Sequence, residues 1–129
     1  MSGRFLLDTN IIIALFAKED TVMQKLANAE DVFVPSIALG ELYFGAGKSA
    51  RAKENTTRID EFAANGAVLF CDTVTAKQYG AIKNQLKVSG SPIPENDIWI
   101  AAIAAQYQLI LVTRDSHFQA VEGLQVEQW

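Results

Sequence analysis

Short, continuously apolar runs alternate along the chain with longer segments in which apolar positions recur at helical spacing. Apolar runs of this kind, bounded by turn residues, predict strands that are buried on both faces. A parallel sheet covered by helices on both sides has such strands, so the pattern predicts an α/β fold. The predicted strands are residues 4–8 (RFLLD), 32–35 (VFVP), 68–70 (VLF), 109–113 (LILVT) and 124–127 (LQVE).

Helices are expected between these strands, and capping residues mark several of their ends. Ser36 is placed to begin one helix, and Asp72 or Thr73 to begin another, because short polar side chains satisfy free backbone N–H groups. Asn65 followed by Gly66 is typical of a helix end. The predicted helices are residues 11–20, 21–29, 37–45, 49–64, 73–88 and 95–108.

The last of these helices (ENDIWIAAIAAQYQ) is apolar nearly all round, which is typical of a helix inside a protein. It follows the breaker segment SGSPIP, and its first turn contains Asp97. An acidic residue at a helix start is most often a cap that also suits the helix dipole. Asp97 is therefore expected to cap the helix, and it gains a second role as a metal ligand if other carboxylates meet it.

Composition narrows the class of protein. The chain has 129 residues, of which 50% are hydrophobic and 20% charged, and this fits one soluble domain with a substantial core. No apolar run approaches the roughly 20 residues that span a membrane, and the first residues lack the pattern of a signal peptide. Cys71 is the only cysteine, so no internal disulfide is expected and a cytoplasmic location is the prediction.

Charge gives no bulk signature of a nucleic-acid binder, since the formal net charge is −4. Basic residues are nevertheless concentrated in residues 48–58 (KSARAKENTTR), where Glu54 is the only acid. On the pattern by itself, a solvated helix face is the favoured interpretation of this segment.

Two carboxylates stand at the predicted carboxyl ends of strands. Asp8 ends the first strand, and Asp115 comes just after the fourth. In open parallel sheets, ligands bind beyond the carboxyl ends of the strands, at the point where the strand order reverses. If the first and fourth strands are neighbours at that point, both carboxylates overhang one crevice, although each alone is also explained as a helix cap.

Glu41 is harder to explain as a structural residue. It is the only charged residue in the segment SIALGELYFGAG, where its neighbours include Leu39, Leu42 and Phe44. A glutamate in such a helix is expected either at an exposed edge or beside a positive group that holds it.

Carboxylates gathered beside apolar segments indicate a divalent cation. Two carboxylates about 4 Å apart repel by roughly 4 kcal/mol at an effective dielectric constant near 20, so a cluster needs a counter-charge. Oxygen ligands favour Mg²⁺ or Mn²⁺, and with one histidine and one cysteine the chain has no set of ligands typical of zinc. Such an ion can activate a water molecule and neutralise phosphate oxygens.

Three residues near these acids are candidates for positioning a substrate or its phosphate: Asn10, Thr113 and Arg114. For Arg114, a surface salt bridge is an equally good explanation. The one histidine, His117, is followed by Phe118 and is expected to pack or to cap a loop.

Four motifs, in this order, resemble those of the PIN-domain family: LLDTN, GELYFG, NDIWIAAIA and LVTRDSHF. The resemblance runs from about Arg4 to Trp129 and is greatest to the VapC-type toxins of bacterial and archaeal toxin–antitoxin pairs. It implies a single three-layer α/β/α domain over residues 1–129, with a five-stranded parallel sheet in the order 3-2-1-4-5.

The resemblance also implies a function. Asp8, Glu41, Asp97 and Asp115 would bind Mg²⁺ or Mn²⁺ in an endoribonuclease that leaves a 5′-phosphate and a 3′-hydroxyl. The partners it implies are an RNA substrate, a second copy of the chain in a homodimer, and a cognate antitoxin whose tail fills the groove near the site. Residues 48–58 would then bind phosphates along the RNA backbone or contact the antitoxin.

The main alternative is a receiver-like signalling domain with Asp72 as the phosphoacceptor. Against it, Asp8 stands alone where a receiver has an acidic pair, and no lysine ends the fifth strand. An aspartyl phosphatase would want a second acid at the position of Asn10. A plain interaction module with four unrelated caps stays open, but it leaves Glu41 unexplained.

Overall fold

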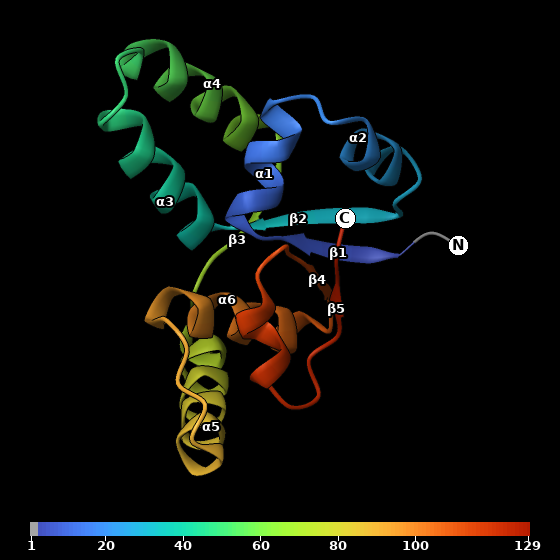
Figure 1. Cartoon of the computed structure of the whole chain (residues 1–129), viewed down its shortest axis with the longest axis vertical. Coiled ribbons are helices and arrows are strands. Elements are labelled where there is room, and N and C mark those ends of the chain that lie inside the picture. The colour runs from blue at the N-terminus through green and yellow to red at the C-terminus, as the bar shows by residue number, and fades with distance from the viewer. Residues whose placement is uncertain (1–2) are drawn as a thin grey trace.

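A parallel sheet of five strands lies between two layers of helices in the computed structural model, which describes residues 3–129 (Figure 1). The strands occupy the order β3-β2-β1-β4-β5, which the family resemblance implied. The order reverses between β1 and β4, where Leu7 is in register with Val112. The strands are β1 (Arg4–Leu7), β2 (Asp31–Pro35), β3 (Ala67–Leu69), β4 (Ile110–Val112) and β5 (Val126–Glu127).

The helices divide between the two faces of the sheet, which gives the predicted three layers (Figure 1). One face is covered by α1 (Thr9–Phe16), α2 (Asp20–Ala27), α3 (Ser36–Gly47) and α4 (Ala52–Asn65). The other is covered by α5 (Thr73–Ser89), α6 (Glu95–Tyr107) and the short 3₁₀ helix η1 (Ser116–Ala120), which the sequence pattern did not predict.

Each face of the sheet has its own apolar core, and successive residues of β1 enter opposite cores because side chains alternate along a strand. Phe5 and Leu7 pack on the side of α1 to α4, whereas Leu6 packs against α6. Ile98 and residues 100–104 of α6 are buried, as the apolar sequence predicted, whereas Trp99 is only partly buried. A helix buried in this way holds its first turn in a fixed place beside the end of β1.

Two of the predicted helix caps are wrong. Ser36 is the first residue of α3 and Asp97 the third of α6, because Pro35 and Pro94 occupy the capping positions. The carbonyl of Pro94 accepts the N–H group of Asp97 at 3.0 Å. The side chain of Asp97 is therefore not needed as a cap. The predicted cap at Asp72 is confirmed by its bond from the backbone N–H of Thr75.

Within residues 3–129, no helix combines the length and the apolar character needed to cross a membrane.

Candidate metal centre

Asp8 lies directly after β1, at the point where the strand order reverses. Its backbone N–H donates to the carbonyl of Val112 at 3.0 Å, which joins it to the end of β4. One carboxylate oxygen accepts the N–H group of Thr9 at 2.8 Å, and the other accepts the hydroxyl of Thr113 at 2.7 Å. Asp8 is only 5% exposed, so its carboxylate is fixed in a site largely withdrawn from water.

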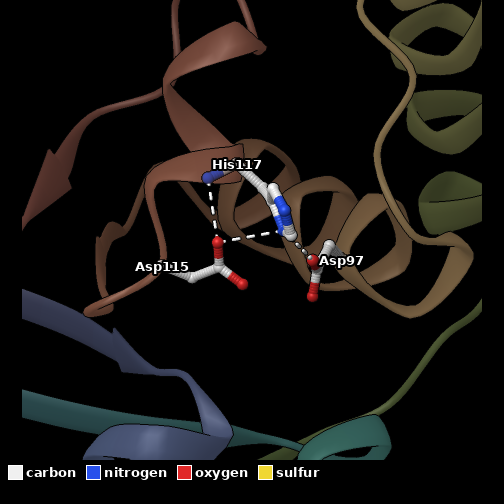
Figure 2. A group of neighbouring side chains, drawn as sticks. All are labelled: Asp97, Asp115 and His117. Carbon is white, nitrogen blue, oxygen red and sulfur yellow. Dashed lines mark hydrogen bonds and ion pairs between the residues drawn. The ribbon is translucent and has the colours of Figure 1, made fainter.

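Asp97, Asp115 and His117 form a cluster beside this carboxylate, and Figure 2 shows their side chains pointing toward one another. Nδ1 of His117 lies 2.9 Å from Oδ1 of Asp115 and 3.4 Å from Oδ2 of Asp97. One possible ligand atom from each residue falls within 4.8 Å of the others. The first turn of α6 and the start of η1 therefore bring three metal-binding groups to one place.

Glu41 joins the site through Thr9. Oγ1 of Thr9 donates to Oε1 of Glu41 at 2.9 Å, while its backbone N–H donates to Asp8. Glu41 is only partly exposed, and in place of a positive group a neutral hydroxyl donates to it. The structure therefore brings all four acids that the sequence singled out to the same edge of the sheet.

Burial and mutual repulsion disfavour the charged forms of Asp8 and Asp97. The pKa of Asp97 is raised to about 6, first because the side chain is withdrawn from water and next because it faces the charge of Asp8. The pKa of Asp8 is also raised, with burial as the largest cause, although the bonds from Thr113 and Thr9 oppose the rise. A bound cation would offset the repulsion between these carboxylates, and their oxygen atoms are the ligands that a hard divalent ion prefers.

Thr113 and Asn10 position the groups around the site. The hydroxyl of Thr113 accepts the N–H group of Asp115 at 3.0 Å while it donates to Asp8. The amide oxygen of Asn10 accepts the N–H group of Arg114 at 3.2 Å, which holds the loop after β4 against the start of α1.

The guanidinium of Arg114 forms the surface salt bridge that the sequence left open as an explanation. It donates to both carboxylate oxygens of Glu19, at 2.8 and 3.2 Å, and to the backbone carbonyl of Trp129 at 2.9 Å. These bonds direct the guanidinium to the residue before α2 and to Trp129, which follows β5. Arg114 thus links the loop after β4 to Glu19 and to Trp129.

Thr9 was not among the predicted site residues, and the favoured packing role of His117 is wrong. Phe118 is fully buried, and it provides the packing that was expected of its neighbour. The ring of His117 is instead half-exposed and faces two acids. The signal available was its place two positions after Asp115 in RDSH, at the end of a strand that already carried a candidate acid.

Comparison with known proteins agrees with this geometry. Residues 5–124 match the PIN domain family. The chain belongs to this family. It is 36% identical to Ribonuclease VapC2 of Haemophilus influenzae and 33% identical to the tRNA(fMet)-specific endonuclease VapC of Shigella flexneri, with 98% of both chains covered in each case. A crystal structure of DNA-bound VapBC from Salmonella typhimurium superposes with a TM-score of 0.90 at 31% identity, over 100% of this chain and 99% of that one.

The PIN-domain resemblance drawn from the four motifs is thereby confirmed, and the receiver-like alternative is not favoured. Asp72, its phosphoacceptor, follows β3 at the edge of the sheet. Its carboxylate there accepts hydrogen bonds from Thr75 and Gln106. A residue engaged in capping α5 is a poor match for a phosphoacceptor at the centre of a site.

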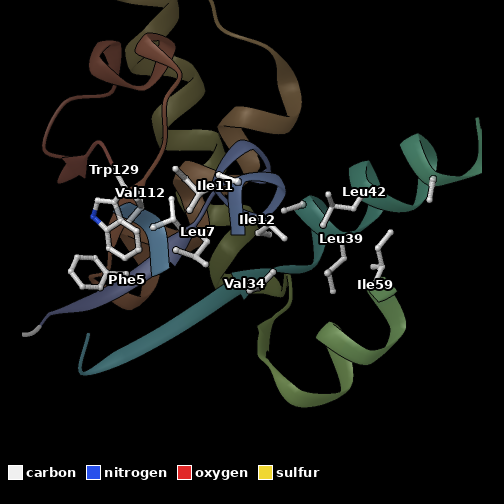
Figure 3. Close-up of a cluster of buried hydrophobic side chains, with 14 residues drawn as sticks. Phe5, Leu7, Ile11, Ile12, Val34, Leu39, Leu42, Ile59, Val112 and Trp129 are labelled. Atoms are coloured by element: carbon white, nitrogen blue, oxygen red, sulfur yellow. The ribbon is translucent and has the colours of Figure 1, made fainter. Parts of the chain in front are cut away.

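A groove of about 380 Å³ leads away from the acids of this PIN domain, between α1, α3 and α4. Thr9 and Glu41 line it at the end near the site, and Leu42 and Ile59, labelled in Figure 3, line it farther out. Arg58 also lines the groove, where it stacks on Phe16 and donates to that residue's carbonyl. Arg58 is the one basic residue of segment 48–58 that lines the groove, and its contacts with Phe16 hold its side chain in place.

Proposed function

We propose that this PIN-domain protein is an endoribonuclease dependent on Mg²⁺ or Mn²⁺ and the toxin of a type II toxin–antitoxin pair. The observation that carries the proposal is the convergence of Asp8, Asp97 and Asp115, with the pKa of Asp97 raised to about 6. Clustered carboxyls at the switch point of a parallel sheet, one of them with a perturbed pKa, are typical of a functional site. The names of the relatives support the same activity.

Asp8, Asp97 and Asp115 would hold the ion directly or through water, and Glu41 would hold a bridging water or a second ion. When bound, the ion lowers the pKa of a coordinated water and neutralises charge on the phosphodiester. The products would carry a 5′-phosphate and a 3′-hydroxyl, as the family resemblance implies.

The other residues of the site prepare these acids for the reaction. Thr9 and Thr113 each donate to one oxygen of Asp8, so the carboxylate cannot rotate, and each oxygen keeps a lone pair for the site. Thr9 also orients Glu41, and Asn10 fixes the loop that carries Asp115. Catalytic groups held in advance cost no reorganisation when the substrate arrives.

Several partners follow from the proposal. The substrate is RNA, with an initiator tRNA as the first candidate because a 33% identical relative is named for it. A cognate antitoxin would place its tail in the groove beside Thr9 and Glu41, and the superposed VapBC structure supports such a pairing. We further propose a homodimer, a cytoplasmic location, and a single nuclease domain over residues 1–129.

The test is cleavage by the purified protein, freed of any antitoxin. We expect it to cut end-labelled tRNA or single-stranded RNA in millimolar Mg²⁺ or Mn²⁺, to stop in EDTA, and to leave 5′-phosphate ends. Asp8→Asn and Asp115→Asn should each lower the rate by about a hundredfold or more, since each removes a charge that the reaction needs.

Asp20→Asn is the matched control, because Asp20 is an exposed acid at the start of α2. It should cleave at the wild-type rate after the same purification, which excludes a contaminating nuclease as the source of any difference. Unchanged cleavage in Asp8→Asn would falsify the assignment of the site.

A further inference from the structure

The only histidine of the chain faces the metal centre, and the proposed function gives it no role. We propose that His117 is a nitrogen ligand of the same divalent cation, and that it makes the centre prefer Mn²⁺ to Mg²⁺. This inference rests on the proposed function, because it concerns the ion that the four acids would hold. It adds a ligand and a choice of metal that the acids alone do not supply.

The distances around the imidazole fit neighbouring ligands of one ion. Donor atoms about 2.1 Å from an octahedral ion lie about 3.0 Å apart when they occupy adjacent positions. Nδ1 of His117 lies 2.9 Å from an oxygen of Asp115 and 3.4 Å from an oxygen of Asp97. A small movement of the first turn of α6 would therefore complete one face of an octahedron.

The backbone around His117 fixes the direction of its ring. Its N–H group donates to Oδ1 of Asp115 at 2.9 Å at the start of η1, and the next residue, Phe118, anchors η1 in the core. The imidazole therefore lies on the solvent side of the acids without being buried itself, since its side chain is 50% exposed. An ion can therefore approach the half-exposed ring from solvent.

A simple hydrogen bond explains the same contacts less completely. Nδ1 can carry one proton, yet carboxylate oxygens from both Asp97 and Asp115 face it. A proton given to Asp115 leaves the contact with Asp97 repulsive or empty, whereas a cation at this point satisfies both acids and the ring. The difference is measurable, because only a ligand nitrogen is bonded directly to the metal.

The choice of metal follows from the donor atoms. Mg²⁺ binds oxygen almost exclusively and sheds water reluctantly, whereas imidazole is a good ligand for first-row transition metals. Replacing one oxygen or water position by the ring of His117 therefore adds more affinity for Mn²⁺ than for Mg²⁺.

The test uses pulsed electron paramagnetic resonance of Mn²⁺ bound to the full chain, prepared without a histidine tag. Because the chain has one histidine, a directly coordinated imidazole ¹⁴N signal can come only from His117. We expect this signal in the wild type and its disappearance in His117→Gln, which still binds Mn²⁺ through the acids. Bound Mn²⁺ without the nitrogen coupling in the wild type overturns the inference but leaves the proposed function standing. A wild type that binds no Mn²⁺ overturns both.

Titration calorimetry tests the selectivity separately. Losing an outer partner of a metal ligand already costs about 10–100-fold in affinity, so His117→Gln should weaken Mn²⁺ binding by at least about tenfold. Mg²⁺ binding should change much less. Ser116→Ala, an exposed neighbour on η1, is the matched control and should bind both ions as the wild type does. An equal loss for the two ions in His117→Gln overturns the preference for Mn²⁺.

Discussion

The hydroxyl of Thr113 donates a hydrogen bond of 2.7 Å to Asp8, across a sequence separation of 105 residues. The same hydroxyl accepts the N–H group of Asp115 at 3.0 Å. One side chain therefore sets the distance between acids that follow the two neighbouring strands at the switch point. Its burial, at 2% exposure, means that water cannot easily replace either bond.

Thr113→Val should damage both stability and activity. Valine has the same shape but leaves a buried carboxylate oxygen and an N–H group without their partner, which costs about 1–3 kcal/mol. Urea unfolding in EDTA should show this as a lower midpoint with an unchanged slope. RNA cleavage in Mn²⁺ should fall by about tenfold or more, because Asp8 loses its fixed orientation.

Thr113→Ser is the control for that experiment, since it keeps the hydroxyl and removes only a methyl group. It should recover most of the cleavage rate. Equal rates in the valine variant and the wild type would show that the Thr113 hydroxyl has no part in positioning Asp8.

The sheet and the four acids were predictable because their signals are local. Continuous apolar runs such as RFLLD identify buried strands without knowledge of their neighbours. Asp8 and Asp115 follow directly from where such runs end, and Glu41 from its isolation in an apolar helix. The order of the strands came from the family resemblance, and the structure confirms it.

The contacts that complete the site were not predictable in the same way. The bonds from Thr9 to Glu41 and from Arg114 to Glu19 join residues 32 and 95 positions apart. They depend on side-chain directions that no periodic pattern encodes. The prediction that Asp97 caps α6 was wrong for a related reason. Glu95, Asn96 and Asp97 all stand near the start of this helix, but the helix begins at Glu95 and the capping position belongs to Pro94. Residue preferences for the capping position do not determine at which residue a helix begins.

Arg114→Lys tests whether Arg114 stabilises the fold through its salt bridge with Glu19 or contacts a phosphate of the substrate. Lysine keeps the charge but lacks the planar fork that binds both oxygens of Glu19, so the melting temperature should fall. If the guanidinium only fastens the fold, RNA cleavage should stay within about threefold of the wild-type rate at a temperature where both proteins are folded. Loss of a contact to the reacting phosphate would instead cost about a hundredfold.

Glu19→Gln is the companion variant for Arg114, because it weakens the same salt bridge from the other side without touching the site. It should lower the melting temperature in the same direction and leave cleavage near the wild-type rate. A large loss of activity in Arg114→Lys, with none in Glu19→Gln, would favour the phosphate role that the sequence suggested.

The stability of the metal-free protein should fall as the pH rises from about 4 and passes through about 6. The pKa of Asp97 is about 6 in the folded protein against an ordinary 3.8, so within this window the native state holds a proton that the unfolded chain has released. Raising the pH removes that proton and leaves a buried charge. Urea unfolding in EDTA at several pH values measures the effect, which should be complete by about pH 7, once Asp97 has lost its proton in the folded protein.

Other carboxyls change stability in the opposite direction at lower pH. The pKa values of Glu19, Asp72 and Glu95 are lowered by their hydrogen bonds, so their contributions are present above their ordinary values of 3.8 to 4.5 and are lost below them. The difference between the wild type and Asp97→Asn at each pH isolates Asp97. If that difference is constant from pH 4 to pH 7, Asp97 does not titrate in this window.

Asp97→Asn should raise the melting temperature of the metal-free protein at pH 7.5 and abolish most of its response to Mn²⁺. Since Pro94 holds the capping position, the substitution removes no cap. Its main effect is to remove a charge that is disfavoured first by burial and next by the carboxylate of Asp8. A gain of about 1–2 kcal/mol would shift the midpoint by roughly 2–8 °C in a domain of this size. The wild type should gain stability as Mn²⁺ is added, because an ion that binds only the folded state contributes RT ln(1 + [L]/Kd). Four thermal melts, each protein in EDTA and in millimolar Mn²⁺, decide the matter. Melting curves that coincide in EDTA and shift equally in Mn²⁺ would remove Asp97 from the metal centre.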